Sequence, residues 1–376
     1  MGSMPDRFTV RPTGSRRRRG NIGAMPSRIL LRTACIVLPL LAGCATAPTM
    51  NLDKPHHTPN GFRNSYASGW TRASFWQWQL ERWRKGVPKN PRDGWHFPSE
   101  RPDVAWITAN RTVPALTWLG HATFLVQAGG LNVLTDPHLS ERASPFGFAG
   151  PKRVMPPALE IRELPHIDAV VVSHNHYDHL DETTVRRLAH QPGGSPRFFV
   201  PLGLKAWFSG RGIHDVVELD WWQSADIGGV RFTLAPVQHW SARTPWDRNR
   251  TLWGGWRVDA PDLSWFFAGD TGYSKDFADI RARLGPVDIA LIPIGAYEPR
   301  WFMGVMHVDP EEAVKIHRDL DARESIAMHW GTFVLTDEPL DEPPHKLAMA
   351  LRAAGIPHDR FRVMKHGETR RPHAGG

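Results

Sequence analysis

A run of metal-ligand side chains at residues 174–179 constrains this chain more than any other feature. The run reads His-Asn-His-Tyr-Asp-His and follows residues 167–172, which are apolar except for Asp168 and are typical of a buried strand. Residues 181–188 come next and have the acidic start of a capped helix. Imidazole and carboxylate groups are common ligands of catalytic zinc, and open α/β sheets place their chemistry at such strand ends. The pattern therefore favours an α/β fold with a metal site over a chance cluster on a solvated turn.

Three later segments each deliver one more candidate ligand at the end of a predicted strand. Residues 230–235 lead to His239, residues 263–268 lead to Asp270, and residues 325–328 lead to His329. A single His or Asp in such a place is more often a hydrogen-bonding residue, but their order after the first run favours a shared metal site. Gly269 would let the backbone approach the metal closely. Asp136 follows another strand end, where we expect a structural turn or an acceptor behind the ligands.

Cysteine usage and charge narrow the chemistry further. The two cysteines are Cys35 and Cys44, so the chain beyond them offers no thiolate, and a metal site there must use His, Asp or Glu. Eight arginines against the single acid Asp6 give residues 1–43 a charge of +7, out of +8 for the whole chain. The remainder is nearly neutral, which argues against a nucleic-acid partner.

The segment from Met25 to Cys44 is typical of a secretory signal. Two arginines precede an apolar stretch that is too short to span a membrane. Its Leu-Ala-Gly-Cys ending resembles a bacterial lipobox, which implies cleavage before Cys44 and lipidation of its thiol. An ordinary signal peptide is the alternative. Because Ala45 follows, and not Asp, we expect a lipid-anchored protein of the bacterial cell envelope, on the outer membrane facing the periplasm.

We therefore predict three regions. Residues 1–44 form a leader with the lipoprotein signal, residues 45–60 form a tether, and residues 61–370 form one hydrolase domain. His56 and His57 lie in the predicted tether and are expected to be solvated residues, not ligands.

The order of the candidate ligands resembles that of the metallo-β-lactamase superfamily. The resemblance implies a four-layer αββα sandwich and two Zn²⁺ ions per chain. One zinc would be held by His174, His176 and His239, the second by Asp178, His179 and His329, and Asp270 would bridge them. Two such metals can activate a water and clamp an oxyanion. Iron and manganese use the same ligand types, so they remain alternatives.

Other segments resemble the N-acyl-phosphatidylethanolamine-hydrolysing phospholipase D family. They are residues 118–124, 238–244, 292–303, 307–313 and 329–333. The resemblance extends from about His56 to Glu368. It implies a zinc-dependent phosphodiesterase that releases N-acylethanolamine and phosphatidic acid, through a hydroxide held between the two zinc ions.

The same resemblance suggests roles for individual residues. Asp178, Asp270 and His307 would be catalytic, with His307 contacting the phosphate or protonating the leaving group. Residues 309–312 predict the start of a helix. The alternative is therefore that His307 has a structural role, as a residue next to the cap of that helix. His121 and Tyr297 are candidates for substrate contact, and His121 is equally a candidate for support of the ligands or for a turn.

Arginines and aromatic residues could complete a lipid site. Arg243, Arg250 and Arg300 are candidates for phosphate or headgroup contacts. The aromatic stretch at residues 70–83 would contact a membrane or an acyl chain, or else pack on the core.

We expect a phospholipid substrate, a membrane surface reached through the lipid anchor and no nucleic acid, and the sequence leaves a homodimer open. Two alternatives remain: a related metallo-hydrolase of another phosphodiester or a lactone, and an envelope scaffold with a structural metal site.

Overall fold

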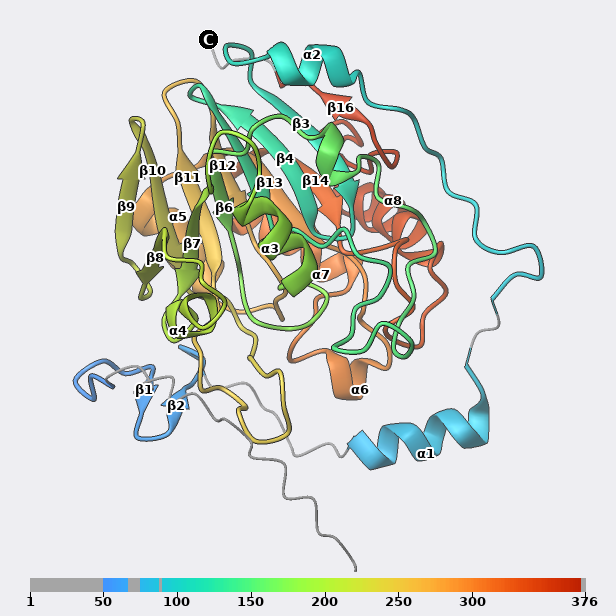
Figure 1. Cartoon of the computed structure of the whole chain (residues 1–376). Coiled ribbons are helices and arrows are strands. Elements are labelled where there is room, and N and C mark those ends of the chain that lie inside the picture. Colours follow the sequence, from blue (N-terminus) through green and yellow to red (C-terminus); the bar gives the residue numbers. More distant parts are fainter. Residues whose placement is uncertain (1–49, 67–74, 88–89, 373–376) are drawn as a thin grey trace, which may run out of the picture. The chain divides into compact units, whose positions relative to one another are not determined.

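The computed structural model describes residues 50–66, 75–87 and 90–372. The predicted leader with Cys44 lies outside these residues, as do residues 45–49 of the predicted tether. Two seven-stranded sheets form the centre (Figure 1). Within the described residues, no helix has both the length and the apolar composition that crossing a membrane requires.

The first sheet carries the 174–179 run at the end of its strand β6. Strands β3 to β5 pair antiparallel, and β5 to β8 pair parallel. In spatial order, the strands are β16 (Thr369–Arg370), β3 (Ala115–Gly120), β4 (Thr123–Ala128), β5 (Leu131–Thr135), β6 (Ala169–Val171), β7 (Arg197–Pro201) and β8 (Val216–Leu219).

The second sheet carries the three later ligands. Strands β9 to β12 pair antiparallel, and β12 to β15 pair parallel. In spatial order, the strands are β15 (Phe361–Arg362), β14 (Ala322–Met328), β13 (Val287–Pro293), β12 (Ser264–Phe267), β11 (Gly255–Asp259), β10 (Val230–Ala235) and β9 (Ser224–Ile227).

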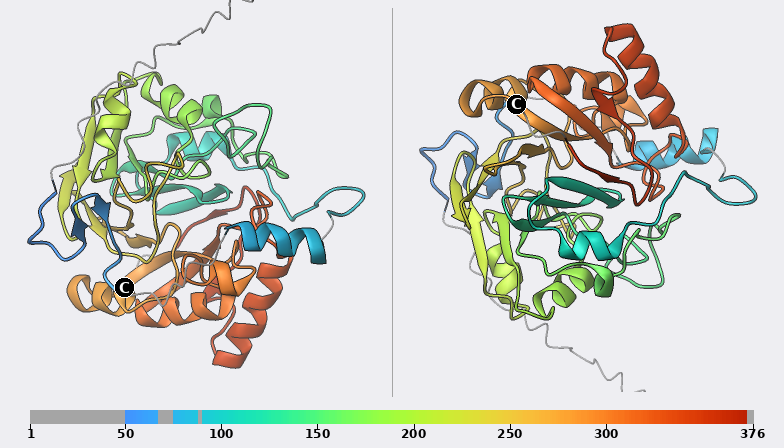
Figure 2. Two further views of the ribbon diagram at one scale, coloured as in Figure 1. Left: turned by 90° about the horizontal axis from the view of Figure 1, so that it is seen from below. Right: turned by 90° about the horizontal axis from the view of Figure 1, so that it is seen from above.

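Helices cover the outer face of each sheet, which confirms the predicted αββα sandwich (Figure 2). The first sheet packs against α2 (Val104–Ala109), α3 (Glu182–Ala189) and α4 (Lys205–Ser209), and one apolar cluster joins them. The second sheet packs against α5 (Asp276–Leu284), α7 (Pro310–Asp319) and α8 (Glu342–Ala354). A short 3₁₀ helix spans Ile161–Glu163, and α6 spans Arg300–Met303.

Large aromatic side chains fill the space between the two sheets. Phe199 of β7 stacks on Phe232 of β10, with ring centres 4.2 Å apart. Trp256 of β11 donates its indole N–H to the carbonyl of Val172, 2.9 Å away, just before the ligand run. Each buried aromatic ring removes about 150–250 Å² from water, so this layer is a large source of stability. It also fixes one sheet against the other where the candidate ligands meet.

The local sequence explains how the ligand loop begins and ends. Strand β6 has no polar residue, and α3 begins after Asp181, whose side chain accepts from the N–H of Thr183. The helix predicted at 181–188 and the strand predicted at 230–235 are both present, and the strands predicted at 263–268 and 325–328 correspond to β12 and to the longer β14.

The segment before residue 63 packs on the domain, so the prediction that His56 and His57 are solvated is wrong. Strands β1 (His57–Thr58) and β2 (Gly61–Phe62) form a hairpin. Both histidines are buried and contact the carboxylate of Asp220, at 2.7 and 3.1 Å. The ring of His56 also stacks on Trp221. The sequence hid this because Asp220 is more than 160 residues away.

Candidate metal centre

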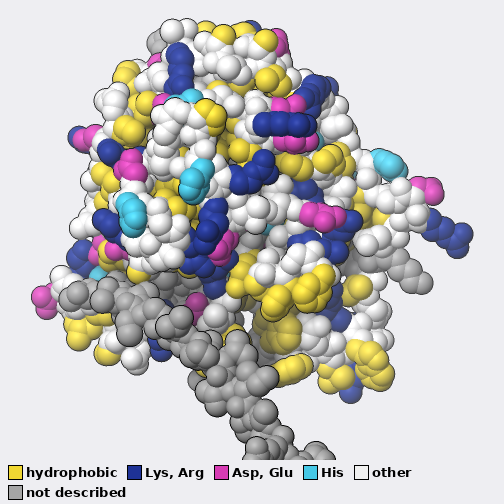
Figure 3. All heavy atoms as spheres, in the orientation of Figure 1, with side chains coloured by type: hydrophobic (Ala, Val, Ile, Leu, Met, Phe, Trp, Pro, Cys, Tyr) yellow, Lys and Arg dark blue, Asp and Glu magenta, His cyan; other side chains and the backbone are white. Residues whose placement is uncertain are grey.

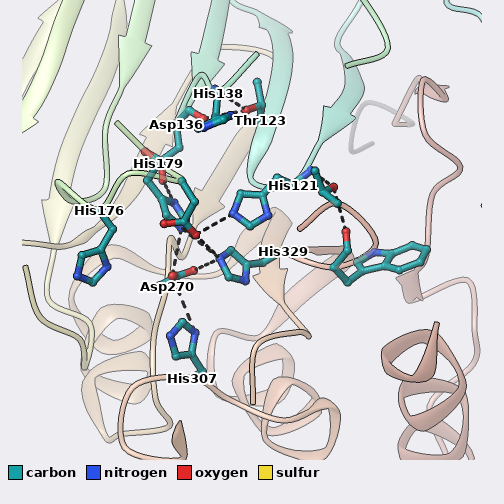
Figure 4. A network of polar contacts seen from close by, with 12 residues as sticks. His121, Thr123, Asp136, His138, His176, His179, Asp270, His307 and His329 are labelled. Carbon is teal, nitrogen blue, oxygen red and sulfur yellow. Dashed lines mark hydrogen bonds and ion pairs between the residues drawn. The ribbon is translucent and has the colours of Figure 1, made fainter. Parts of the chain in front are cut away.

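The predicted ligands of both sheets converge at one end of the sandwich. Figure 4 shows the rings of His176, His179, His307 and His329 turned toward Asp270. His174 to His179 follow β6, His239 follows β10, Asp270 follows β12 and His329 follows β14. The order of strand ends that the sequence predicted therefore brings all of these side chains together.

One group of donors has the composition predicted for the first metal. Single donor atoms of His174, His176, His239 and Asp270 lie within 4.8 Å of one another. Nε2 of His174 is 2.8 Å from Nδ1 of His176, and Nε2 of His239 is 3.3 Å from that same Nδ1. Ring nitrogens this close need a cation or a shared proton between them.

A second group has the composition predicted for the other metal, with one addition. Donor atoms of Asp178, His179 and His329 lie within 4.8 Å of one another, and His121 joins them. Asp270 reaches this group as well, because its carboxylate is 3.1 Å from Nε2 of His179 and 3.0 Å from Nε2 of His329. Asp270 thus touches both groups, as a bridging ligand would.

Neighbouring acceptors fix the orientation of three of the imidazole rings. Nδ1 of His179 lies 2.6 Å from Asp136, Nδ1 of His174 lies 2.8 Å from the hydroxyl of Ser173, and Nδ1 of His239 lies 2.9 Å from the carbonyl of Met306. Such partners turn Nε2 of each ring toward the metal and set its tautomer. Asp136 therefore has the supporting role that the sequence suggested.

The charges in the site fit a metal cation. Burial lowers the pKa of His174 and of His239, which keeps these rings neutral as metal ligation requires. Burial also lowers the pKa of His329, but Asp270 and Asp178 outweigh it and raise that pKa to about 9. The carboxylates thus attract positive charge, which a divalent ion would supply. Nε2 of His176 is buried without a hydrogen-bond partner. The donors present therefore fit one or two metal ions.

Backbone strain is concentrated in the turns around these ligands. His121, Asp136 and His329 have φ angles of 53°, 32° and 61°. Such values are uncommon for residues with a side chain, and they occur often at active sites. Gly269 has a φ of 60°, and a Cβ there would lie 2.5 Å from Cβ of Ser173. Gly269 is thus needed for the close approach to Ser173, and the expected approach of its backbone to a metal stays a prediction.

His307 borders the same site from the second sheet's side. Its Nδ1 is 3.9 Å from Asp270, and burial lowers its pKa to about 4, against the opposing effect of Asp270. Its carbonyl accepts a hydrogen bond of 2.7 Å from Arg300. Helix α7 begins just after it, with Asp309 in a capping box with Glu312. His307 is thus near a helix cap and also faces the candidate metals.

A cavity of about 550 Å³ opens onto the metal ligands. Its lining includes His176, Asp178, Asp270 and His307, so the cavity leads to both donor groups. The rest of the lining is mainly apolar or aromatic: Phe75, Trp78, Tyr177, Trp240, Ala296, Phe302, Met303, Met306 and Leu335, with Arg248 and Thr336. Phe75 and Trp78 belong to α1 (Phe75–Lys85), so part of the predicted aromatic stretch does reach the site.

Helix α1 is attached to the site through Trp78. The Trp78 ring stacks on Phe302, with ring centres 5.1 Å apart. Its indole N–H donates to Asp337 over 2.7 Å, and Arg82 pairs with the same carboxylate.

Two residues predicted to touch the substrate, His121 and Tyr297, make contacts within the protein. His121 is buried, and its Nε2 lies 3.0 Å from Asp178, so it supports a metal ligand instead of lining the cavity. Tyr297 is also buried, and its hydroxyl donates to Glu342 over 2.7 Å. The Tyr297 hydroxyl is therefore engaged within the protein, and its contact with a substrate stays a prediction.

The three arginines proposed for phosphate contacts do not line the cavity. Arg243 donates to the carbonyls of Asn175 and Leu180 and so holds the ligand loop from behind. Arg300 is engaged by the carbonyl of His307 and by Glu312.

Sequence reasoning missed two residues at the site. Arg248 lines the cavity, and Asn64 accepts from the backbone N–H of His239 over 3.0 Å. Nothing in the local sequence marks either residue, because each contact depends on how distant segments pack.

Comparisons with known proteins agree with this geometry. Residues 131–330 match the family described as the β-lactamase superfamily domain. The chain is 46% identical over 242 residues to N-acyl-phosphatidylethanolamine-hydrolyzing phospholipase D 1 of Caenorhabditis elegans, covering 61% of this chain and 68% of that one. It is 30% identical over 244 residues to a UPF0173 metal-dependent hydrolase of Methanopyrus kandleri, covering 64% of this chain and 93% of that one.

Among solved structures, the metallo hydrolase Igni18 of Ignicoccus hospitalis shares the fold. Its TM-score is 0.52 at 21% identity, and the match covers 69% of this chain and 98% of that one. The converging ligands and these matches together show that the chain belongs to the β-lactamase superfamily, as a metal-dependent hydrolase homologous to the N-acyl-phosphatidylethanolamine-hydrolysing phospholipases D.

Proposed function

We propose that the protein hydrolyses the phosphodiester bond of N-acyl-phosphatidylethanolamine and releases N-acylethanolamine and phosphatidic acid. The observation that carries this proposal is the apolar cavity that ends on two groups of metal donors. A phosphodiester with long acyl chains needs both an apolar wall and a site for its charged centre. The similarity to the phospholipase of Caenorhabditis elegans supports the same substrate class.

We assign two zinc ions to the two donor groups, with Asp178 and Asp270 as the carboxylate ligands. When bound, such ions supply an activated water and neutralise charge on the phosphoryl oxygens. The protein orients their ligands through Asp136, Ser173 and the carbonyl of Met306. Asp270 would hold that water between the two groups, since it contacts donors of both.

His307 is the polar group best placed to contact the phosphoryl group or the leaving oxygen. It lines the cavity, it is neutral at neutral pH, and Nδ1 has no hydrogen-bond partner. A neutral ring can donate one N–H to the phosphoryl oxygen. Arg300 holds the backbone at this position, so little entropy is lost when that contact forms.

We further propose that the protein works at a membrane surface, anchored through lipidated Cys44 on the outer membrane and facing the periplasm. Large apolar side chains are exposed near the cavity, and Figure 3 shows them gathered around α1 and α6. They include Trp76, Trp83 and Trp301, and tryptophan suits the membrane interface. A lipid entering from the bilayer would meet this surface before it reached the metals.

The decisive experiment uses the full chain in detergent, loaded with zinc and with its metal content measured. It is incubated with N-acyl-phosphatidylethanolamine, and the products are identified by mass. We expect N-acylethanolamine and phosphatidic acid in equal amounts, and a loss of at least about 100-fold in the Asp270→Asn variant. If the fully loaded protein leaves this lipid intact but opens a lactone or cleaves another phosphodiester, the substrate proposal is wrong and the hydrolase assignment stands.

A further inference from the structure

The cavity combines an apolar wall with a single basic side chain. Phe302, Met303, Met306 and Leu335 supply apolar surface, and α1 adds Phe75 and Trp78. Among the described residues that line the cavity, Arg248 is the one Lys or Arg. A positive charge at the wall of a cavity attracts an anion that enters it.

Arg248 lies close to the metal ligands. Its Cζ is 4.0 Å from the ring centre of Trp240, and that ring is 4.3 Å from the ring of His176. The guanidinium group and a metal-ligating imidazole therefore contact the same indole ring. A group bound at the metals and a group bound at Arg248 could belong to one small molecule.

The loop that carries Arg248 is held on both sides. Asp247 accepts from the backbone N–H groups of Arg243 and Thr244. Asn249 donates its N–H to Ser241 and accepts from Phe62 through its carbonyl. Burial lowers the pKa of Arg248, but an arginine remains charged at neutral pH. The cavity thus has a positioned cation at its wall.

We propose that Arg248 is a specificity-determining residue that binds the anionic phosphoryl group of a phosphodiester substrate. This inference rests on the proposed function and explains how one metal site would distinguish substrates. A guanidinium group matches two oxygens of a phosphodiester, and stacking on Trp240 limits its motion. An uncharged ester or lactone in the same cavity gains nothing from this charge. Arg248 therefore favours anionic diesters.

The test measures binding to the zinc-loaded full chain by calorimetry. The probes are dihexyl phosphate, its uncharged methyl ester and inorganic phosphate. The variants are Arg248→Gln and Arg248→Lys, with Arg250→Gln as a matched control, because Arg250 is exposed on the same loop and does not line the cavity. Turnover of N-acyl-phosphatidylethanolamine by the wild type is measured in parallel.

We expect Arg248→Gln to weaken binding of dihexyl phosphate at least about tenfold, since one nearby unit charge is lost. Binding of the methyl ester should be unchanged, Arg248→Lys should be intermediate, and Arg250→Gln should match the wild type. Unchanged binding of dihexyl phosphate by Arg248→Gln, or an equal loss for dihexyl phosphate and its methyl ester, would overturn the inference. If inorganic phosphate binds more tightly than dihexyl phosphate, and Arg248→Gln weakens that binding, Arg248 belongs to a site for free anions instead.

The two proposals fail in different ways. If the wild type cleaves the lipid, and Arg248→Gln binds dihexyl phosphate as tightly as the wild type, only the role of Arg248 is wrong. If the zinc-loaded wild type neither binds dihexyl phosphate nor cleaves the lipid, both the proposed function and the role of Arg248 are wrong.

Discussion

His121 illustrates how a residue that stands outside both predicted ligand sets can shape the metal centre. Its carbonyl accepts from the N–H of His329, and its ring contacts Asp178. One residue in a strained turn thus holds a ligand from each sheet. The sequence placed His121 near the chemistry but could not give this role, because Asp178 and His329 meet it only after both sheets have packed.

Replacing His121 with Asn should weaken metal binding and leave the fold intact. Asn tolerates the positive φ of this position but cannot reach Asp178 as the imidazole does. Loss of a supporting partner typically lowers metal affinity about 10–100-fold. Competition with a chelator measures the affinity, and circular dichroism checks the fold. Wild-type affinity in the variant would show that His121 serves the turn alone.

At the scale of elements, the segment of residues 50–64 supports the second sheet's metal ligands. Asp220 anchors the segment through Lys54, His56 and His57. The segment then carries Asn64 to the loop that holds His239. Residues 50–60 of the predicted tether are therefore part of the folded domain, and they position Asn64 beside the site.

Replacing Asn64 with Ala should destabilise the protein by about 1–3 kcal/mol. The variant leaves the backbone N–H of His239 without its acceptor, and an unpaired buried donor costs about this much. Urea unfolding measures the loss. Asn64→Asp keeps an oxygen at this position and serves as the control. If Asn64→Ala unfolds at the wild-type urea concentration, the hydrogen bond contributes nothing to stability.

Helix α7 introduces a dependence of stability on pH. His317 is packed against β14, with Nδ1 2.7 Å from the hydroxyl of Ser325. Burial lowers its pKa to about 4, with Arg360 and Arg318 acting in the same direction. The unfolded chain binds a proton here near pH 6.5, whereas the folded chain does not until about pH 4. Stability contributed at this position is therefore complete above pH 6.5 and falls as the pH drops toward 4.

The matching variant is His317→Gln. We expect its free energy of unfolding to fall less steeply than that of the wild type between pH 6.5 and 4, as measured by urea titration at a series of pH values. Parallel curves for the two proteins would show that His317 is protonated equally in the folded and unfolded states.

At the scale of the whole molecule, local signals predicted that candidate ligands stand at the ends of successive strands, and the resemblance to the metallo-β-lactamase superfamily implied the sandwich. Each ligand follows an apolar strand, and parallel strands deliver their carboxyl ends to the same edge. The cavity wall could not be predicted in this way. Phe302 lies in the short helix α6, Met306 lies in the turn after it, and Leu335 follows β14. No periodicity in the sequence marks segments that meet only in the folded chain.

The apolar surface around α1 gives a prediction for membrane binding. Trp76 and Trp83 are about 80% exposed, at 78% and 82%. Burying a large apolar side chain is worth roughly 1.5–3 kcal/mol, so replacing both with Ser should weaken partition into vesicles at least about tenfold. Sedimentation with phosphatidylethanolamine vesicles measures this, with Met349→Ser, on α8, as the control. Equal partition of the double variant and the wild type would contradict the prediction.

The division of the metal donors between two sheets has a consequence for biogenesis. Within residues 90–372, the chain completes β3 to β8 before it begins β9, and it returns to the first sheet only with β16. A nascent polypeptide that stops before residue 230 carries the donors of residues 174–179 but lacks His239, Asp270 and His329. Hydrolytic competence therefore arises late in synthesis, when the second half closes over the first, and incomplete translation products are inactive.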